Sequence, residues 1–216
     1  MLSLAQKIDQ LIEEKSLLKH PFYQLWSDGK LSIAMLAGYA KEYFQMVKAV
    51  PTFVNDIIAF APSEMVDGLR KNQAEEAEHI ALWVNFATAL GLSKAEVIEY
   101  EGLEPTNEAV EELSVLMDSL RGGAVAMYAF EKDIPRVSRT KVEGLKAFYG
   151  ITSEQGTEYF NLHMEADIRH AAAWQSILDT IPEEEHETML RIAEQSLDVQ
   201  NHLLDSCLEG YCKNAA

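Results

Sequence analysis

The chain has 216 residues, of which 48% are hydrophobic and 25% charged, and its formal net charge at pH 7 is −17. This length and balance are typical of a globular protein with a substantial core. The strong negative charge argues against binding to nucleic acid or to an anionic membrane surface. The start has no apolar signal-peptide core, and no uncharged run approaches the roughly 20 residues of a membrane helix. We therefore expect a cytoplasmic protein without membrane or nucleic-acid partners.

Helical periodicity, with few turn residues, marks the first half of the chain. Leu4, Ile8 and Leu11 repeat at helical spacing, which predicts an amphipathic helix to about residue 18. With only 11 Gly and 6 Pro in the chain, long helices are the expectation. The next expected elements are a short helix opened by Pro21, a helix over residues 32–61 capped by Ser32 and kinked at Pro51, and a helix over residues 63–91 capped by Ser63.

The second half of the chain continues in the same way, with no strand alternation or repeat. Its expected elements are a short helix opened by the capping box Ser93–Glu96, a helix over residues 106–120, a break or close helix crossing at Gly122-Gly123, a helix to about Gly150 kinked at Pro135, a helix opened by Thr152–Gln155, and a last helix after Pro182. The sequence thus predicts a single all-α domain over residues 1–216, with about seven helices.

One octapeptide in the second half carries three side chains that can bind a metal. His163, Asp167 and His170 follow the spacing i, i+4, i+7, which places them within about 60° of one another on a helix. Two imidazoles and a carboxylate suit iron, manganese or zinc. Arg169 lies about 80° away from this stripe, which suggests a partner of a ligand or a surface charge. The alternative interpretation is an exposed acidic helix face on which two histidines happen to align.

Two other segments offer the remaining ligands of such a site. Glu76 and His79 form a Glu-x-x-His pair, the usual unit of di-metal sites in helix bundles, although Glu-rich faces are often only solvated. Glu131 follows residues 124–130, which carry no charge, so its carboxylate is expected to be buried and paired or to line a cavity. With the octapeptide, these residues give three carboxylates and three histidines. That set suits two irons or an iron–manganese pair, which can activate O₂, better than one structural zinc.

Several motifs together make the chain similar to a known group of proteins. They are HPFYQLWSDG from His20, YAKEY from Tyr39, HIALW from His79, EKDIPR from Glu131, KVEGL from Lys141 and EADIRH from Glu165. In these motifs the chain resembles the haem-oxygenase-like di-metal oxidases, a group that includes thiaminase-like and pyrroloquinoline-quinone-synthase-like proteins. Within the group it is most similar to a chlamydial family of proteins that associate with death domains and are linked to p-aminobenzoate synthesis. The resemblance implies a seven-helix haem-oxygenase-like bundle.

The resemblance also implies a ligand set in the order Glu, His, Glu, His, Asp, His. The matching positions here are Glu76, His79, Glu131, His163, Asp167 and His170. One departure concerns the first glutamate, which in the similar proteins lies seven residues before its histidine. In this chain the choice is Glu75 or Glu76, and we prefer Glu76 because the i, i+3 pair is usual at di-iron sites.

In the relatives that form p-aminobenzoate for folate synthesis, the protein is its own substrate. A tyrosine supplies the ring, a lysine supplies the amino group, and the metals activate O₂ with an external reductant. The matching residues here are Tyr23 and Lys141, which without the resemblance would be interpreted as a core aromatic and a solvated lysine. Tyr39 and Tyr43, one helical turn apart, are candidates for the wall of the site or a radical relay. Phe130 stands where a tyrosine occurs in a relative, so that phenol is absent here.

Three other functions compete with this one. A thiaminase-like hydrolase would need a cysteine nucleophile in the middle of the chain, whereas both cysteines lie within its last ten residues. A conventional di-metal oxygenase could use the same ligands on an external small molecule. A protein-interaction module would explain an association with death domains, but it would have no use for a metal site. The resemblance further implies a homodimer.

Overall fold

The computed structural model describes residues 2–213, which form ten α-helices and two short 3₁₀ turns, with no strand among them. The helices are α1 (Leu4–Glu14), α2 (Pro21–Ser27), α3 (Ile33–Ile58), α4 (Ser63–Ala89), α5 (Lys94–Ile98), α6 (Glu104–Val115), α7 (Leu120–Glu131), α8 (Ile134–Phe148), α9 (Glu154–Leu178) and α10 (His186–Tyr211). The prediction of an all-α bundle is confirmed. The number of helices exceeds the expected seven for two reasons. The short helices α2 and α5 add to the long ones, and residues 120–148 form two helices instead of one.

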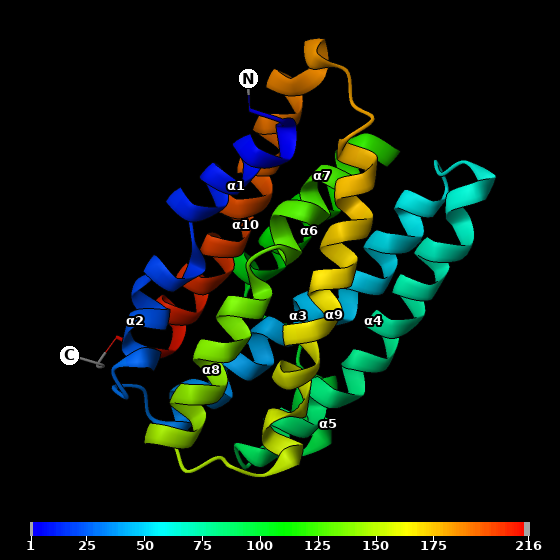
Figure 1. Ribbon diagram of the computed structural model, residues 1–216. Helices are drawn as coiled ribbons and strands as arrows, with labels where there is room; N and C mark the ends of the chain where they lie inside the picture. Colours follow the sequence, from blue (N-terminus) through cyan, green and yellow to red (C-terminus); the bar gives the residue numbers. More distant parts are fainter. Residues whose placement is uncertain (1, 214–216) are drawn as a thin grey trace.

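The long helices enclose one apolar interior (Figure 1). α1 and α10 lie together along one side of the bundle and α4 lies along the opposite side, with α9 packed between α4 and α7. The interior contains the three tryptophans Trp26, Trp83 and Trp174, all fully buried. Within the part of the chain that the structure describes, none of the helices combines the length and apolar character of a membrane span.

Several predicted helix boundaries differ from those observed; the helix expected over residues 106–120, for example, is α6, which runs from Glu104 to Val115. α1 ends at Glu14, and residues 17–19 form a separate 3₁₀ turn instead of extending the helix. At the start of α4, the prediction that Ser63 caps the helix is wrong. The capping position is occupied by Pro62 in an extended conformation, and no side chain caps this helix. Proline favours that position because its ring fixes φ near the value found here, −64°.

Proline also divides the predicted helix over residues 122–150. Instead of a kink at Pro135, the chain leaves the helix after Glu131 and begins α8 at Ile134, with Pro135 in the first turn. Backbone N–H groups of a first turn have no partner inside the helix, so the N–H that proline lacks is not missed there. Pro51, by contrast, remains inside the continuous helix α3. α9 is capped by the Ser153 hydroxyl alone, without the reciprocal bond of the predicted capping box.

The glycine pair at the start of α7 marks a close helix crossing, one of the two predicted interpretations. A Cβ atom added to Gly123 would lie 2.4 Å from Cγ1 of Ile57, a buried residue of α3. The backbone of α7 therefore approaches α3 more closely than any other residue would allow. This contact brings the end of α7, with Glu131, into the interior of the bundle.

We expect Gly123→Ala to lower the free energy of unfolding by about 1–3 kcal/mol, because Ile57 must move to make room for the methyl group. Urea unfolding followed by circular dichroism measures this change. Gly68→Ala in α4 is the matched control, since its Cβ would meet nothing within 4 Å. It should stabilise the helix by about 0.5–1 kcal/mol. Equal effects of the two substitutions would contradict the close crossing.

Candidate metal centre

The six side chains predicted as metal ligands lie in one buried cluster formed by three helices. α4 contributes Glu76 and His79, α7 contributes Glu131, and α9 contributes His163, Asp167 and His170; as whole residues, none is more than 7% exposed. Two overlapping groups in this cluster each have ligand atoms within 4.8 Å of one another. They are Glu76 with His79 and His163, and Glu76 with Asp167 and His170. Glu76 is thus shared between two places where an ion could bind.

Contacts within α4 and within α9 orient the histidines of the cluster. Glu76 and His79 project from one face of α4, with His79 Nδ1 3.2 Å from Glu76 Oε2. On α9, His163 Nδ1 donates a hydrogen bond to the backbone carbonyl of Tyr159 at 2.7 Å. Because a carbonyl can only accept, Nδ1 carries the proton and Nε2 is the nitrogen that remains to bind a metal.

Glu131 enters the cluster from α7. Its Oε2 atom accepts a hydrogen bond from Nε1 of Trp174 at 2.7 Å, whereas its Oε1 atom is buried without a partner. Burial, together with the charge of Asp167, raises the pKa of Glu131 well above its usual range. Residues 124–130, which carry no charge, are thus followed by a buried carboxylate, that of Glu131, as predicted.

Within residues 2–213, three polar atoms of the cluster have no hydrogen-bond partner: Glu76 Oε1, Glu131 Oε1 and His170 Nδ1. His170 Nδ1 lies 3.1 Å from Glu76 Oε1 and 3.6 Å from Asp167 Oδ1, but neither contact has hydrogen-bond geometry. Leaving a buried polar atom unpaired costs about 1–3 kcal/mol. Divalent cations would satisfy all three atoms, so the residues present fit a metal centre.

The protonation of the cluster without metal is set by its own charges. Burial by itself would raise the pKa of Glu76, but His170 and His79 outweigh it and lower this pKa. Burial would likewise lower the pKa of His170, yet the neighbouring Asp167 and Glu76 raise it to about 11. Burial raises the pKa of Asp167. A bound cation would take over the balancing charge that His170 supplies.

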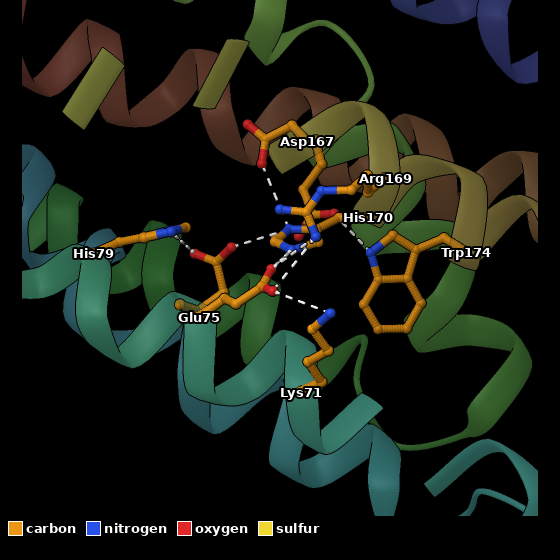
Figure 2. Close-up of polar contacts among 9 residues, drawn as sticks. Lys71, Glu75, His79, Asp167, Arg169, His170 and Trp174 are labelled. Atoms are coloured by element: carbon orange, nitrogen blue, oxygen red, sulfur yellow. Dashed lines mark hydrogen bonds and ion pairs between the residues drawn. The ribbon is translucent and has the colours of Figure 1, made fainter. Parts of the chain in front are cut away.

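Glu75, the alternative first ligand, lies outside this cluster. Its Oε2 atom is 2.9 Å from His170 Nε2, on the side of the ring opposite to Glu76, and 3.2 Å from Arg169 Nη1 (Figure 2). Its side chain is 25% exposed, compared with 8% for Glu76. The geometry therefore favours Glu76 as the ligand. Arg169 thus pairs with Glu75 and not with a candidate ligand, and its side chain is 57% exposed, which agrees with the predicted interpretation as a surface charge.

A second buried cluster contains the predicted tyrosine and lysine residues. The hydroxyl groups of Tyr23 and Tyr39 are 3.1 Å apart, and Lys141 Nζ donates to the Tyr39 hydroxyl at 2.8 Å. Nζ also lies 5.2 Å from the ring centroid of Tyr23 and 5.1 Å from that of Tyr43. No carboxylate of residues 2–213 forms an ion pair with Lys141. Burial lowers its pKa to about 7, so near neutral pH much of this amine is uncharged.

Tyr43 connects the two clusters. Its ring centroid lies 5.5 Å from that of Tyr39, and its side chain lines a cavity of about 20 Å³ together with Glu76 and Asp167. Phe130 lines the same cavity, so its wall carries no phenol at this position. The cavity has room for about one water-sized molecule next to the candidate ligands.

Two residues of the site were not predicted. Tyr159 stacks on His163 with ring centroids 4.0 Å apart, and Trp174 donates to Glu131. Each lies four residues from a histidine of α9, Tyr159 before His163 and Trp174 after His170. Helical spacing alone could have found them, because residues four apart share a face.

Comparison with known proteins places the chain in a family. Residues 5–210 match the TENA/THI-4/PQQC family, and the chain belongs to it. It is 34% identical over 214 residues to a 4-aminobenzoate synthase of Chlamydia pneumoniae, covering 95% of each chain. It is 31% identical over 228 residues to a 4-aminobenzoate synthase of Nitrosomonas europaea, covering 97% of this chain and 92% of the relative.

A crystal structure of a Shewanella denitrificans domain with a haem-oxygenase-like fold is similar, with a TM-score of 0.77, 17% identity, and coverage of 99% of this chain and 93% of that one. The predicted haem-oxygenase-like bundle is confirmed. The synthase relatives also confirm, at the level of enzyme class, the prediction of an oxidative enzyme.

Proposed function

We propose that this protein is an O₂-activating di-metal oxidase that forms p-aminobenzoate, the compound named 4-aminobenzoate in its relatives. In this proposal the side chain of Tyr23 supplies the ring and Lys141 supplies the amino nitrogen. The relatives over nearly the whole chain support the product. The buried contact between Lys141 and the Tyr23–Tyr39 pair supports the choice of the two residues.

The candidate ligands would hold two ions, one between Glu76, His79 and His163 and the other between Glu76, Asp167 and His170, with Glu131 in the wall of the adjoining cavity. Two redox-active ions, iron or an iron–manganese pair, would supply O₂ activation with electrons from an external reductant. The donor set of three carboxylates and three imidazoles suits such ions.

The size of the cavity favours a ring taken from the protein itself. A small-molecule pocket usually measures about 300–1,000 Å³, whereas the space beside the candidate ligands is about 20 Å³. O₂ could enter such a space, but a second aromatic molecule could not without rearrangement of the core. The alternative of an external aromatic substrate is therefore less well supported than Tyr23, a buried tyrosine that packs on Tyr39, which in turn packs on Tyr43 in the cavity wall.

The protein's own residues prepare the reaction in three ways. Lys141, with its pKa lowered to about 7, can present a free amine lone pair. The Tyr39 hydroxyl accepts from that amine and also contacts the Tyr23 hydroxyl, so it can pass a proton between them. The surrounding rings of Tyr43, Trp83 and Phe160 exclude water from the amine.

The test is to incubate the reduced, iron- and manganese-loaded protein with air and to measure both p-aminobenzoate and the mass of the chain. We expect at most one product molecule per chain and mass changes that peptide mapping assigns to residue 23, which loses its ring, and to residue 141, which loses its amino nitrogen. Tyr23→Phe should form no product because the phenol that is oxidised is absent. Tyr149→Phe, which removes another phenol packed on Trp26, should behave as the wild type.

If Tyr23→Phe still formed labelled product from an added substrate over many turnovers, the external-substrate function would replace this one. The homodimer implied by the resemblance stays a prediction, as does any death-domain partner.

A further inference from the structure

The two histidines of α9 are held by different partners and present different nitrogen atoms to the cluster. His163 uses Nδ1 to bind the Tyr159 carbonyl, which leaves Nε2 for an ion. His170 has the opposite arrangement. Its Nε2 atom contacts Glu75, while its Nδ1 atom, without a hydrogen-bond partner, faces Glu76 and Asp167.

We propose that Glu75 is the positioning residue of one half of the metal centre, the subsite of Glu76, Asp167 and His170. This proposal rests on the proposed metal function. The Glu75 carboxylate accepts a hydrogen bond from the Nε2–H group of His170. This bond fixes the ring with Nδ1 toward the ion, and the carboxylate makes the imidazole a stronger donor. Glu75 contacts Nε2 of His170, whereas the ion would bind at Nδ1 of the same imidazole, so Glu75 is not itself a ligand of that ion.

Surface cations fix Glu75 in this role. Arg169 Nη1 lies 3.2 Å and 3.4 Å from the two carboxylate oxygens, and Lys71 Nζ lies 3.9 Å from Oε1. Figure 2 shows the contacts of Arg169, Lys71 and His170 converging on Glu75. Arg169 and Lys71 are 57% and 76% exposed, so Glu75 stands between solvent and the buried His170. Both carboxylate oxygens of Glu75 are thus held by cations, and a fixed carboxylate limits the rotation of the His170 imidazole that contacts it.

The other subsite does not depend on Glu75. His163 is oriented by a backbone carbonyl, and His79 contacts Glu76 instead. A substitution of Glu75 should therefore weaken one of two ions and leave the other unchanged. A general loosening of the bundle would weaken both.

Zinc titration of the metal-free protein, followed by calorimetry and chelator competition, tests this asymmetry without any turnover. We expect the wild type to bind about two Zn²⁺ ions. Glu75→Ala should weaken one of them by about 10–100-fold and leave the other unchanged. Glu75→Gln, whose amide oxygen can still accept from Nε2–H, should recover part of the loss. Asp67→Ala, which removes an exposed carboxylate nearer the start of α4, should match the wild type.

Nitrogen-15 NMR of the zinc-loaded wild type gives a direct readout that does not depend on a variant folding. The His170 ring should show zinc on Nδ1 and a proton on Nε2 that exchanges slowly with water, and this proton should exchange faster in Glu75→Ala. Zinc on Nε2 of His170, or equal affinities of both ions in Glu75→Ala and the wild type, would overturn the inference alone. A wild-type chain that binds no zinc would overturn the proposed function together with it.

Discussion

A protein in which His163 and His170 are both replaced by alanine will lose most of about two equivalents of iron or manganese per chain. Each histidine belongs to a different one of the two ligand groups that share Glu76. With both imidazoles removed, Glu76, Glu131 and Asp167 keep only His79 as a nitrogen donor. Metal content measured by mass spectrometry after desalting gives the result, with the helical circular dichroism spectrum retained.

His202→Ala is the matched control, because His202 is an exposed histidine on α10, away from the cluster. It should keep the full metal content. Added metal should also raise the midpoint of thermal unfolding of the wild type and of this control, but not that of the double variant, since only a folded site binds the ion. A wild-type protein without metal at neutral pH, or a double variant with full metal content, would contradict the metal centre.

Lys141→Met will abolish p-aminobenzoate formation and at the same time stabilise the fold. The amine is buried and forms no ion pair with a carboxylate of the described residues 2–213, and burial lowers its pKa from 10.5 to about 7. Each pKa unit corresponds to about 1.4 kcal/mol. The contacts with aromatic rings and with Tyr39 return part of this energy. We expect methionine to raise the free energy of unfolding by about 2 kcal/mol below pH 7.

The pH dependence has a definite sign. The pKa of Lys141 is lower in the folded chain than in the unfolded chain, so between about pH 7 and 10.5 the unfolded chain binds more protons. The stability of the wild type relative to Lys141→Met therefore rises across this window, and the advantage of methionine shrinks. Urea unfolding of both proteins from pH 6 to pH 10 tests this. Lys146→Met, on the exposed face of α8, is the control without such a trend. A constant advantage across that range would refute the buried, neutral amine.

Helical spacing and local charge were sufficient to predict most of the candidate site. His163, Asp167 and His170 could be placed on one face because their spacing matches the helical period, and they do meet in the interior. Glu131 could be predicted as buried because an uncharged run precedes it. Tyr23 and Lys141 were different, since nothing local separates a buried lysine from a solvated one. Only the family resemblance singled them out before the structure placed them in contact with Tyr39.

Two features depended on contacts between distant segments. The break between α7 and α8 could be interpreted as a kink, because Pro135 is compatible with both a bent helix and a new one. Adjacent glutamates on α4 could also not be assigned from their spacing to His79 alone. Glu75 and Glu76 differ by about 100° around the helix, and the position of α9 decides which of them faces the cluster.

The sequence by itself determined the helical class, the family and five of the six candidate ligands, because these follow from periodicity, charge and motifs that lie within single helices. Tertiary structure decided what each polar atom faces. It placed Glu76 inside the cluster and Glu75 behind His170, and it left three polar atoms unpaired around one buried space. The physical reason is that burial and hydrogen bonding are properties of packed helices, and a side chain acquires them only when a second helix approaches it.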